Sequence, residues 1–340
     1  MRDIKKIAVI GDGGWGTSLA MVLAENGYDT TLWSAFTKQA EQMRELRENK
    51  LYLPGIHLPD QLKFSADAYA TAHNADLVVS VVPTKFLRTV IRRFEDALPS
   101  ATPIVSATKG IEIETFYRPT QIIVEELGER PICALTGPTH AEEVALKKPA
   151  SIVAASTDAE LASDVQTVFS CDHLRVYASG DPIGAELGGA LKNVIAIAAG
   201  ISDGLKLGDN AKAALLTRGM VEMARFGKRL GAKAETFFGL AGFGDLVTTC
   251  CSQHSRNRMV GERLGAGETL TEILSDMKMV AEGVNTTKAL FGPESETRDV
   301  SMPIAEQVHA ILFENKNPYD GVVDLMTRAP AREMDGLTEA

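Results

Sequence analysis

The sequence has few of the features that mark secreted, membrane and metal-binding proteins. Its 340 residues contain no apolar run of membrane-spanning length, and the start enters a strand without a hydrophobic signal region. Only four cysteines are present, Cys133, Cys171, Cys250 and Cys251, and an adjacent pair is a poor disulfide framework. Neither a C-x-x-C nor an H-E-x-x-H pattern occurs, so no metal site is predicted. We therefore expect a cytoplasmic protein with no membrane insertion.

Positive charge is also scarce. The chain has 35 Lys and Arg against 45 Asp and Glu, a net charge of −10. An acidic surface argues against nucleic acid or an anionic membrane as a partner, although a local basic pocket for a small anion stays possible. At about 150 residues per domain, the length indicates two domains, each large enough for its own core.

A glycine-rich turn near the N-terminus is the clearest motif. The apolar run Ile7–Ile10 predicts a strand, and Gly11, Gly13 and Gly16 follow with G-x-G-x-x-G spacing before a predicted helix over 17–26. In a dinucleotide-binding turn, the first glycine allows the bend, the second lets the backbone approach a pyrophosphate, and the third lets helix and strand pack closely. Helix N–H groups then face the anion. The strand and helix on either side favour a Rossmann unit over a glycine turn without function.

The second predicted strand, Asp29–Trp33, bears on cofactor choice. An NAD-preferring Rossmann fold has an acid at the end of this strand to bind the adenosine ribose. Here the strand is followed by Ser34-Ala35-Phe36-Thr37-Lys38, without a carboxylate. This absence tilts the prediction toward NADPH or toward no strong preference. Asp12, close to the expected phosphates, is predicted to point outward.

Further apolar runs predict more strands of a doubly wound sheet. They cover 76–82, 104–107, 132–135 and 151–155, and helix-like stretches separate most of them. Ligands of such a sheet bind at the carboxyl ends of its strands, where Lys109 and Thr139 follow two of the runs. Beyond residue 180 the patterns are helical only. We predict an α/β fold with a Rossmann-like doubly wound domain over 1–183 and an all-helical substrate-binding and dimerisation domain over 184–340.

The helical half carries three candidate groups. Lys192 lies in a predicted helix, 185–202, that is apolar on nearly every side, so this cation needs a partner or a chemical duty unless it reaches the surface. Asn193 could orient it. The glycine cluster at 239–244 predicts a turn that presents Asp245, and Arg256, after a plausible N-cap at Ser255, suits a phosphate. A solvated surface arginine is the alternative.

Six motifs taken together resemble NAD(P)-dependent glycerol-3-phosphate dehydrogenases of the bacterial type. They are Gly-Asp-Gly-Gly-Trp-Gly-Thr at 11–17, Ala-Thr-Lys-Gly at 107–110, Thr-Gly-Pro-Thr at 136–139, Leu-Gly-Gly-Ala-Leu-Lys-Asn at 187–193, Gly-Phe-Gly-Asp-Leu at 242–246 and Ser-Arg-Asn-Arg at 255–258. The resemblance implies reversible hydride transfer between sn-glycerol 3-phosphate and dihydroxyacetone phosphate. It also implies a cytoplasmic homodimer that supplies glycerol 3-phosphate for phospholipid synthesis.

The resemblance also implies roles for particular residues. Lys192 is the implied proton acceptor. Implied substrate contacts are Lys109, Gly137, Thr139, Lys192, Asp245, Ser255, Arg256 and Asn257. Implied contacts to NADPH or NADH are Gly11, Gly13, Gly14, Trp15, Gly16, Lys109, Ala141, Arg256, Val280 and Glu282. The pair Ala35-Phe36 departs from the basic or polar residue that the family often has after the second strand, which weakens the case for a 2′-phosphate contact.

Two other classes fit part of the pattern. A β-hydroxyacid or 6-phosphogluconate type dehydrogenase has a similar Gly-Gly to Lys-Asn helix, but it would prefer a carboxylate substrate, and the Ser-Arg-Asn motif argues against it. A noncatalytic nicotinamide-sensing protein would leave Lys192 and Asp245 without a chemical duty.

Overall fold

The computed structural model describes residues 2–277, 281–295, 299–330, 332–334 and 336–337. It divides into two compact units. One comprises Met1–Thr108 and Pro119–Pro182, and the other comprises Lys109–Arg118 and Ile183–Ala340. The predicted division after residue 183 did not include the short excursion of Lys109–Arg118 into the second unit.

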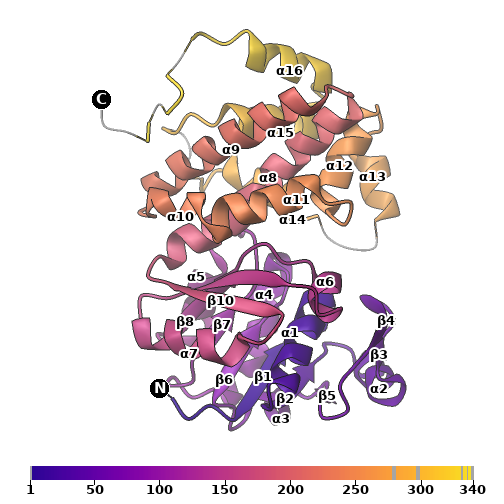
Figure 1. Ribbon diagram of the computed structural model, residues 1–340, viewed down its shortest axis with the longest axis vertical. Coiled ribbons are helices and arrows are strands. Elements are labelled where there is room, and N and C mark those ends of the chain that lie inside the picture. The colour runs from indigo at the N-terminus through magenta and orange to yellow at the C-terminus, as the bar shows by residue number, and fades with distance from the viewer. Residues whose placement is uncertain (1, 278–280, 296–298, 331, 335, 338–340) are drawn as a thin grey trace. The chain divides into compact units, whose positions relative to one another are not determined.

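The first unit is built on an eight-stranded sheet, which confirms the predicted doubly wound fold (Figure 1). The strand order is β10-β9-β8-β7-β6-β1-β2-β5. The strands are β1 (Lys6–Ile10), β2 (Asp29–Trp33), β5 (Lys63–Ser65), β6 (Leu77–Ser80), β7 (Ile104–Ser106), β8 (Ile132–Thr136), β9 (Ala150–Ala155) and β10 (Leu174–Ser179). A separate hairpin pairs β3 (Glu48–Asn49) with β4 (Leu53–His57).

Burial explains why the central strands read as unbroken apolar runs. Every residue of β6 and β7 is buried, as are the last four of β1, so both faces of the sheet are covered. The covering elements are α1 (Gly14–Glu25), α2 (Thr37–Leu46), α3 (Ala68–Ala72), α4 (Thr84–Ile91), the 3₁₀-helix η1 (Arg92–Ala97), α5 (Pro119–Leu127), α6 (Ala141–Ala145) and α7 (Ala159–Phe169). Among these, α1 packs with α6 and α7, and α4 packs with α5 and η1.

Strand β9 departs from the rhythm predicted for the sheet, because it runs antiparallel to β8. The connecting helix, α6, has only five residues. At about 1.5 Å per residue it is too short to run back along a strand of roughly 16 Å. The chain therefore re-enters the sheet at the edge where β8 ends, and the carboxyl ends of β1, β2, β6, β7 and β8 share that edge.

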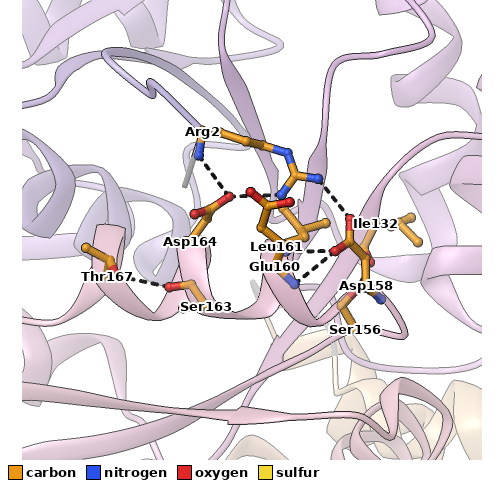
Figure 2. Close-up of polar contacts among 9 residues, drawn as sticks. All are labelled: Arg2, Ile132, Ser156, Asp158, Glu160, Leu161, Ser163, Asp164 and Thr167. Carbon is orange, nitrogen blue, oxygen red and sulfur yellow. Dashed lines mark hydrogen bonds and ion pairs between the residues drawn. The ribbon is translucent and has the colours of Figure 1, made fainter.

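The N-terminal segment is tied to the start of α7 by Arg2 (Figure 2). Its guanidinium donates from Nη2 to Asp158 Oδ2 at 2.8 Å and from Nη1 to Asp164 Oδ2 at 2.9 Å. Asp158 is also the N-cap of α7, because its Oδ1 accepts from the N–H groups of Glu160 and Leu161. The cap bond from Leu161 is the largest cause that holds the pKa of Asp158 below its usual value, and the hydrogen bond from Arg2 is the next.

We expect Asp158→Ala to lower the free energy of unfolding at pH 7 by about 1–2 kcal/mol, the usual cost of losing an N-cap. The difference should shrink as pH falls through the depressed pKa of Asp158, since the carboxylate stabilises the folded state only while ionised. Urea unfolding at several pH values measures it. Asp158→Asn, which keeps a cap and removes the charge, should lose less, and equal stability of all three proteins would contradict the assignment.

Within the described residues, the regular secondary structure of the second unit is helical. The helices are α8 (Pro182–Gly204), α9 (Asp209–Arg229), α10 (Ala234–Phe238), the π-helical turn η2 (Leu240–Gly244), α11 (Asp245–Cys251), α12 (Arg256–Gly265), α13 (Leu270–Asp276), α14 (Glu282–Leu290), α15 (Pro303–Phe313) and α16 (Pro318–Met326).

Helix α8 forms the centre of this unit. The sequence was expected to contain no run of membrane-spanning length, yet α8 is long and apolar enough to cross a membrane. Of its most apolar window, 94% is buried inside the protein, as in the core helix of a globular fold. It packs closely on α12 through glycines, because a Cβ on Gly261 would lie 1.9 Å from the carbonyl oxygen of Ile197. This close approach places the start of α12 near the middle of α8.

Candidate active site

A buried lysine on α8 donates hydrogen bonds to two side chains of α11. Lys192 is 6% exposed. Its Nζ donates to Asp245 Oδ1 at 2.5 Å and to Thr249 Oγ1 at 2.6 Å. Thr249 was missed in the sequence, although its position four residues after Asp245 on a helix places both on one face. Lys192 therefore does not reach the surface, and its ammonium is held among buried groups.

The same carboxylate holds a second lysine. Lys109 Nζ donates to Asp245 Oδ2 at 2.7 Å, so each oxygen of Asp245 serves one ammonium group. The Asp245 side chain is 2% exposed and that of Lys109 is 19% exposed. The result is a buried cluster of two cations around one anion. Lys109–Arg118 belongs to the second unit, and Ile111 and Phe116 of this segment lie in its hydrophobic core.

Close backbone packing brings Asp245 to Lys192. A Cβ on Gly188 of α8 would lie 2.5 Å from the carbonyl oxygen of Ala241, and one on Gly242 would lie 2.1 Å from that of Phe237. Glycine at these positions lets the π-helical turn η2 rest on α8 and continue directly into α11. Asp245 is the first residue of α11, as the predicted backbone-dense turn required. π-helical turns are frequent at functional sites.

The cluster changes the proton affinity of Lys192. Burial, which is the largest cause, and the neighbouring charge of Lys109 together lower its pKa to about 8, although the charge and hydrogen bond of Asp245 oppose this shift. A lysine with this pKa exchanges a proton near neutral pH, where an ordinary lysine stays protonated. The geometry therefore provides a proton donor and acceptor at Lys192 Nζ.

The suggestion that Asn193 orients Lys192 is wrong. Asn193 Nδ2 donates to the carbonyl of Gly189 at 3.3 Å, and its Oδ1 accepts from Asn257 Nδ2 at 2.9 Å. Adjacent residues of a helix point in different directions, so Asn193 faces α12 instead. Asn257 in turn accepts the N–H of Gly283 at 2.9 Å, which links α8, α12 and α14.

The start of α12 carries the predicted Ser255 and Arg256. Ser255 caps the helix by accepting the N–H of Arg258, and Arg256 follows as an exposed first residue. Nearby, Glu282 begins α14, and its Oε2 is buried with no hydrogen-bond partner among the described residues. Burial raises the pKa of Glu282 to about 7, with Arg256 opposing the shift. Val280, also predicted to contact the cofactor, lies outside the described residues.

The glycine turn of the first unit has the geometry that the motif predicted. Gly11 has φ +112°, and a Cβ there would lie 2.9 Å from the carbonyl oxygen of Val81. A Cβ on Gly16 would lie 1.9 Å from the carbonyl oxygen of Gly11, so the helix can pack on the strand only with glycine. A Cβ on Gly13 would meet nothing within 4 Å. The space over Gly13 is therefore open to a ligand.

Other predicted residues of the first unit lie beside this turn. A Cβ on Gly14 would lie 3.4 Å from the Cβ of Ala141. The backbone carbonyl of Ala141 accepts a hydrogen bond from Ser18 Oγ at 2.8 Å. Trp15 Nε1 is buried without an acceptor in the described part of the chain. After β8, Thr139 Oγ1 donates to the carbonyl of Gly137 at 3.2 Å. No group of three or more metal-ligating side chains occurs among the residues that the structure covers.

The prediction that Asp12 points outward is wrong. The residue is 8% exposed, and its Oδ2 accepts a hydrogen bond from Ser34 Oγ at 2.8 Å. A hydroxyl at the end of β2 supplies the partner that a carboxylate needs when it leaves water. Asp12 is therefore directed toward the end of the second strand.

A dinucleotide turn in one unit and a buried lysine–carboxylate cluster in the other place this chain among the nicotinamide-dependent dehydrogenases, which are oxidoreductases. The chain belongs to the NAD-dependent glycerol-3-phosphate dehydrogenase family. The model of the family's N-terminal domain matches residues 6–162, and that of its C-terminal domain matches residues 181–323.

Individual relatives agree over nearly the whole chain. Glycerol-3-phosphate dehydrogenase [NAD(P)+] of Syntrophotalea carbinolica is 49% identical over 332 residues, which cover 97% of this chain and 99% of the relative. The crystal structure of glycerol-3-phosphate dehydrogenase from Coxiella burnetii superposes with a TM-score of 0.91 at 38% identity, covering 96% of this chain and 99% of that one. A ketopantoate reductase from Ralstonia eutropha shares the fold alone, with a TM-score of 0.59 at 16% identity.

Proposed function

We propose that this protein catalyses the reversible interconversion of sn-glycerol 3-phosphate and dihydroxyacetone phosphate, and thereby supplies glycerol 3-phosphate for phospholipid synthesis. The observation that carries the proposal is the buried cluster of Lys192, Asp245 and Lys109 in a chain of this family. A noncatalytic sensor would have no use for a lysine whose pKa is about 8.

The first unit suits NADH or NADPH. The open space over Gly13 and the orphaned indole N–H of Trp15 are the features that a bound dinucleotide would use. When bound, the nicotinamide exchanges a hydride with the substrate carbon. The residues proposed to hold the cofactor are Gly11, Gly13, Gly14, Trp15, Gly16, Lys109, Ala141, Arg256 and Glu282.

In this proposal Lys192 is the proton-transfer group. Its protonated Nζ would donate to the carbonyl oxygen during reduction, and its neutral Nζ would accept the hydroxyl proton during oxidation. Asp245 and Thr249 fix the position of Nζ, and Lys109 keeps Asp245 from holding the proton too firmly on Lys192. These partners make Lys192 a positioned acid and base.

The phosphate is assigned to the start of α12. Arg256 offers a fork of donors at the positive end of a helix dipole, and both favour an anion. Holding a remote phosphate also aligns the reacting carbon. The full set of proposed substrate contacts is Lys109, Gly137, Thr139, Lys192, Asp245, Ser255, Arg256 and Asn257.

Arg256→Ala tests the function and the phosphate site together. We expect the wild-type protein to oxidise NADH or NADPH in the presence of dihydroxyacetone phosphate. The variant should raise KM for this substrate by roughly 10- to 150-fold, the range for a lost charge-assisted hydrogen bond. A smaller fall in kcat should follow from misalignment of the carbonyl. Steady-state absorbance at the nicotinamide band measures both quantities.

Arg263→Ala is the matched control, because Arg263 lies on the same helix and, within the described part of the chain, forms its ion pairs with Glu268 and Asp276. It should leave KM unchanged. A normal KM in Arg256→Ala would contradict the phosphate assignment. No turnover of dihydroxyacetone phosphate by the wild-type protein would contradict the proposed function.

We also propose that the protein is a cytoplasmic homodimer. Support comes from the family resemblance and from α16, where Tyr319, Val323 and Met326 form one apolar stripe that is 58%, 41% and 80% exposed. A second copy would remove this stripe from water. Light scattering of the purified protein gives the mass that decides the point.

A further inference from the structure

A buried acid of the glycine turn lies at the position that selects cofactors in Rossmann folds. Asp12 stands between Gly11 and Gly13, yet its carboxylate is hydrogen-bonded to Ser34, the first residue after β2. In NAD-preferring Rossmann folds an acid at the end of this strand binds the 2′-hydroxyl of the adenosine ribose. No acid follows β2 in the sequence. Instead, the carboxylate of Asp12 from the glycine turn lies at the end of this strand.

Several bonds fix this arrangement. The carbonyl of Asp12 accepts from Asn49 Nδ2 at 2.7 Å and from Thr17 Oγ1 at 3.3 Å. Ser34 Oγ also accepts the N–H of Phe36 at 3.2 Å, and the N–H of Ser34 donates to the carbonyl of Ser65 at 2.9 Å. Both partners of the Asp12–Ser34 pair are therefore held by their own backbone contacts.

The charge on this pair is not neutralised by a cation. Among the described residues no cation acts on Asp12, whose hydrogen-bond partners are Ser34 and its own backbone N–H, and the exposed Phe36 stands where a basic side chain could otherwise meet a phosphate. Burial of Asp12 raises its pKa, and the hydrogen bonds from Ser34 and from its own backbone N–H favour the ionised carboxylate and oppose this shift. A 2′-phosphate would meet the negative charge of this pair, whereas a ribose hydroxyl could donate to it.

We propose that Asp12, anchored by Ser34, selects NADH over NADPH by favouring a 2′-hydroxyl and repelling a 2′-phosphate at the end of β2. The proposal rests on the proposed function only for the identity of the dinucleotide. It replaces the earlier prediction of NADPH or no strong preference, which was based on the absence of an acid after β2. The selecting group comes from the pyrophosphate turn and not from the second strand.

The test measures binding and kinetics in Asp12→Asn, which keeps the shape and removes the charge. The wild-type protein should use NADH with a kcat/KM at least about tenfold above that for NADPH, and the variant should shift this ratio toward NADPH by about tenfold or more. Calorimetry with adenosine 2′,5′-bisphosphate and adenosine 5′-monophosphate should show the same shift without turnover. Asp29→Asn removes an equal charge from the opposite end of β2 and should shift neither ratio.

The outcomes separate this proposal from the proposed function. An unchanged binding ratio in a folded Asp12→Asn protein, or a wild-type preference for NADPH, overturns the role of Asp12. A shifted binding ratio in a protein that does not reduce dihydroxyacetone phosphate supports Asp12 and overturns the function. If Asp12→Asn does not fold, Ser34→Ala frees the carboxylate from its anchor, and an unchanged ratio there overturns the proposal.

Discussion

Replacing Lys192 with alanine is expected to lower kcat for dihydroxyacetone phosphate reduction by about 10²–10⁴-fold, the usual contribution of general acid–base catalysis. Binding of NADH should persist, because the glycine turn belongs to the other unit. Lys212→Ala is the matched control, since Lys212 pairs with Asp203 at 2.9 Å and takes no part in the cluster. A near-normal kcat in Lys192→Ala would remove Lys192 from the reaction.

The same lysine predicts opposite pH profiles for the two directions. Because its pKa is about 8, Lys192 loses its proton as pH rises through that value. Reduction needs the protonated form, so its kcat/KM should fall above about pH 8. Oxidation needs the neutral form, so its kcat/KM should rise and level off there. Profiles measured with both substrates, and the loss of this dependence in Lys192→Ala, check the assignment.

Gly13→Val is expected to weaken NADH binding by about 100-fold or more while the protein stays folded. The side chain would occupy the open space over the turn and would cost the pyrophosphate its backbone hydrogen bonds. The fold should tolerate it, because no atom lies within 4 Å of the added Cβ and φ is −61°. Fluorescence titration gives the affinity, and thermal unfolding checks the fold.

Gly16→Val separates packing from ligand contact within the same motif. Its Cβ would lie 1.9 Å from the carbonyl oxygen of Gly11. We expect this variant to lower the free energy of unfolding by roughly 1–3 kcal/mol or more. If Gly13→Val unfolds as readily as Gly16→Val, or binds NADH normally, the pyrophosphate assignment fails.

Elements with a strong periodic pattern were predictable. The run before Gly11 became β1, Asp29–Trp33 became β2, and the apolar stretch around Lys192 became α8. Strand β10 was missed, although Leu174 and Val176 are buried and their neighbours exposed, which is the alternation of a strand covered on one face. The three residues of β5 are too few for any period to be read.

The sequence predicted which residues belong to the site, but it did not predict which side chains contact one another. Lys192, Asp245 and Lys109 were each singled out, and an unexplained cation in an apolar helix correctly indicated a partner. The sequence pattern did not show which side chains form hydrogen bonds with each other. Asn193 was expected beside Lys192, yet Thr249 is its partner, because neighbours along a helix diverge while residues four apart share a face.

Local patterns in the sequence alone determined the glycine turn, the alternation of strands and helices, and the central lysine helix, because hydrophobic period and glycine spacing act over a few residues. The tertiary structure alone decided which distant groups meet. Lys192 reaches Asp245 across 53 positions, and Asp12 reaches Ser34 across 22. Such meetings depend on how closely whole elements pack, and Gly188 permits the close approach of η2 to α8 that brings Asp245 to Lys192. The sequence places no carboxylate directly after β2, but the folded chain brings the carboxylate of Asp12 to the end of this strand.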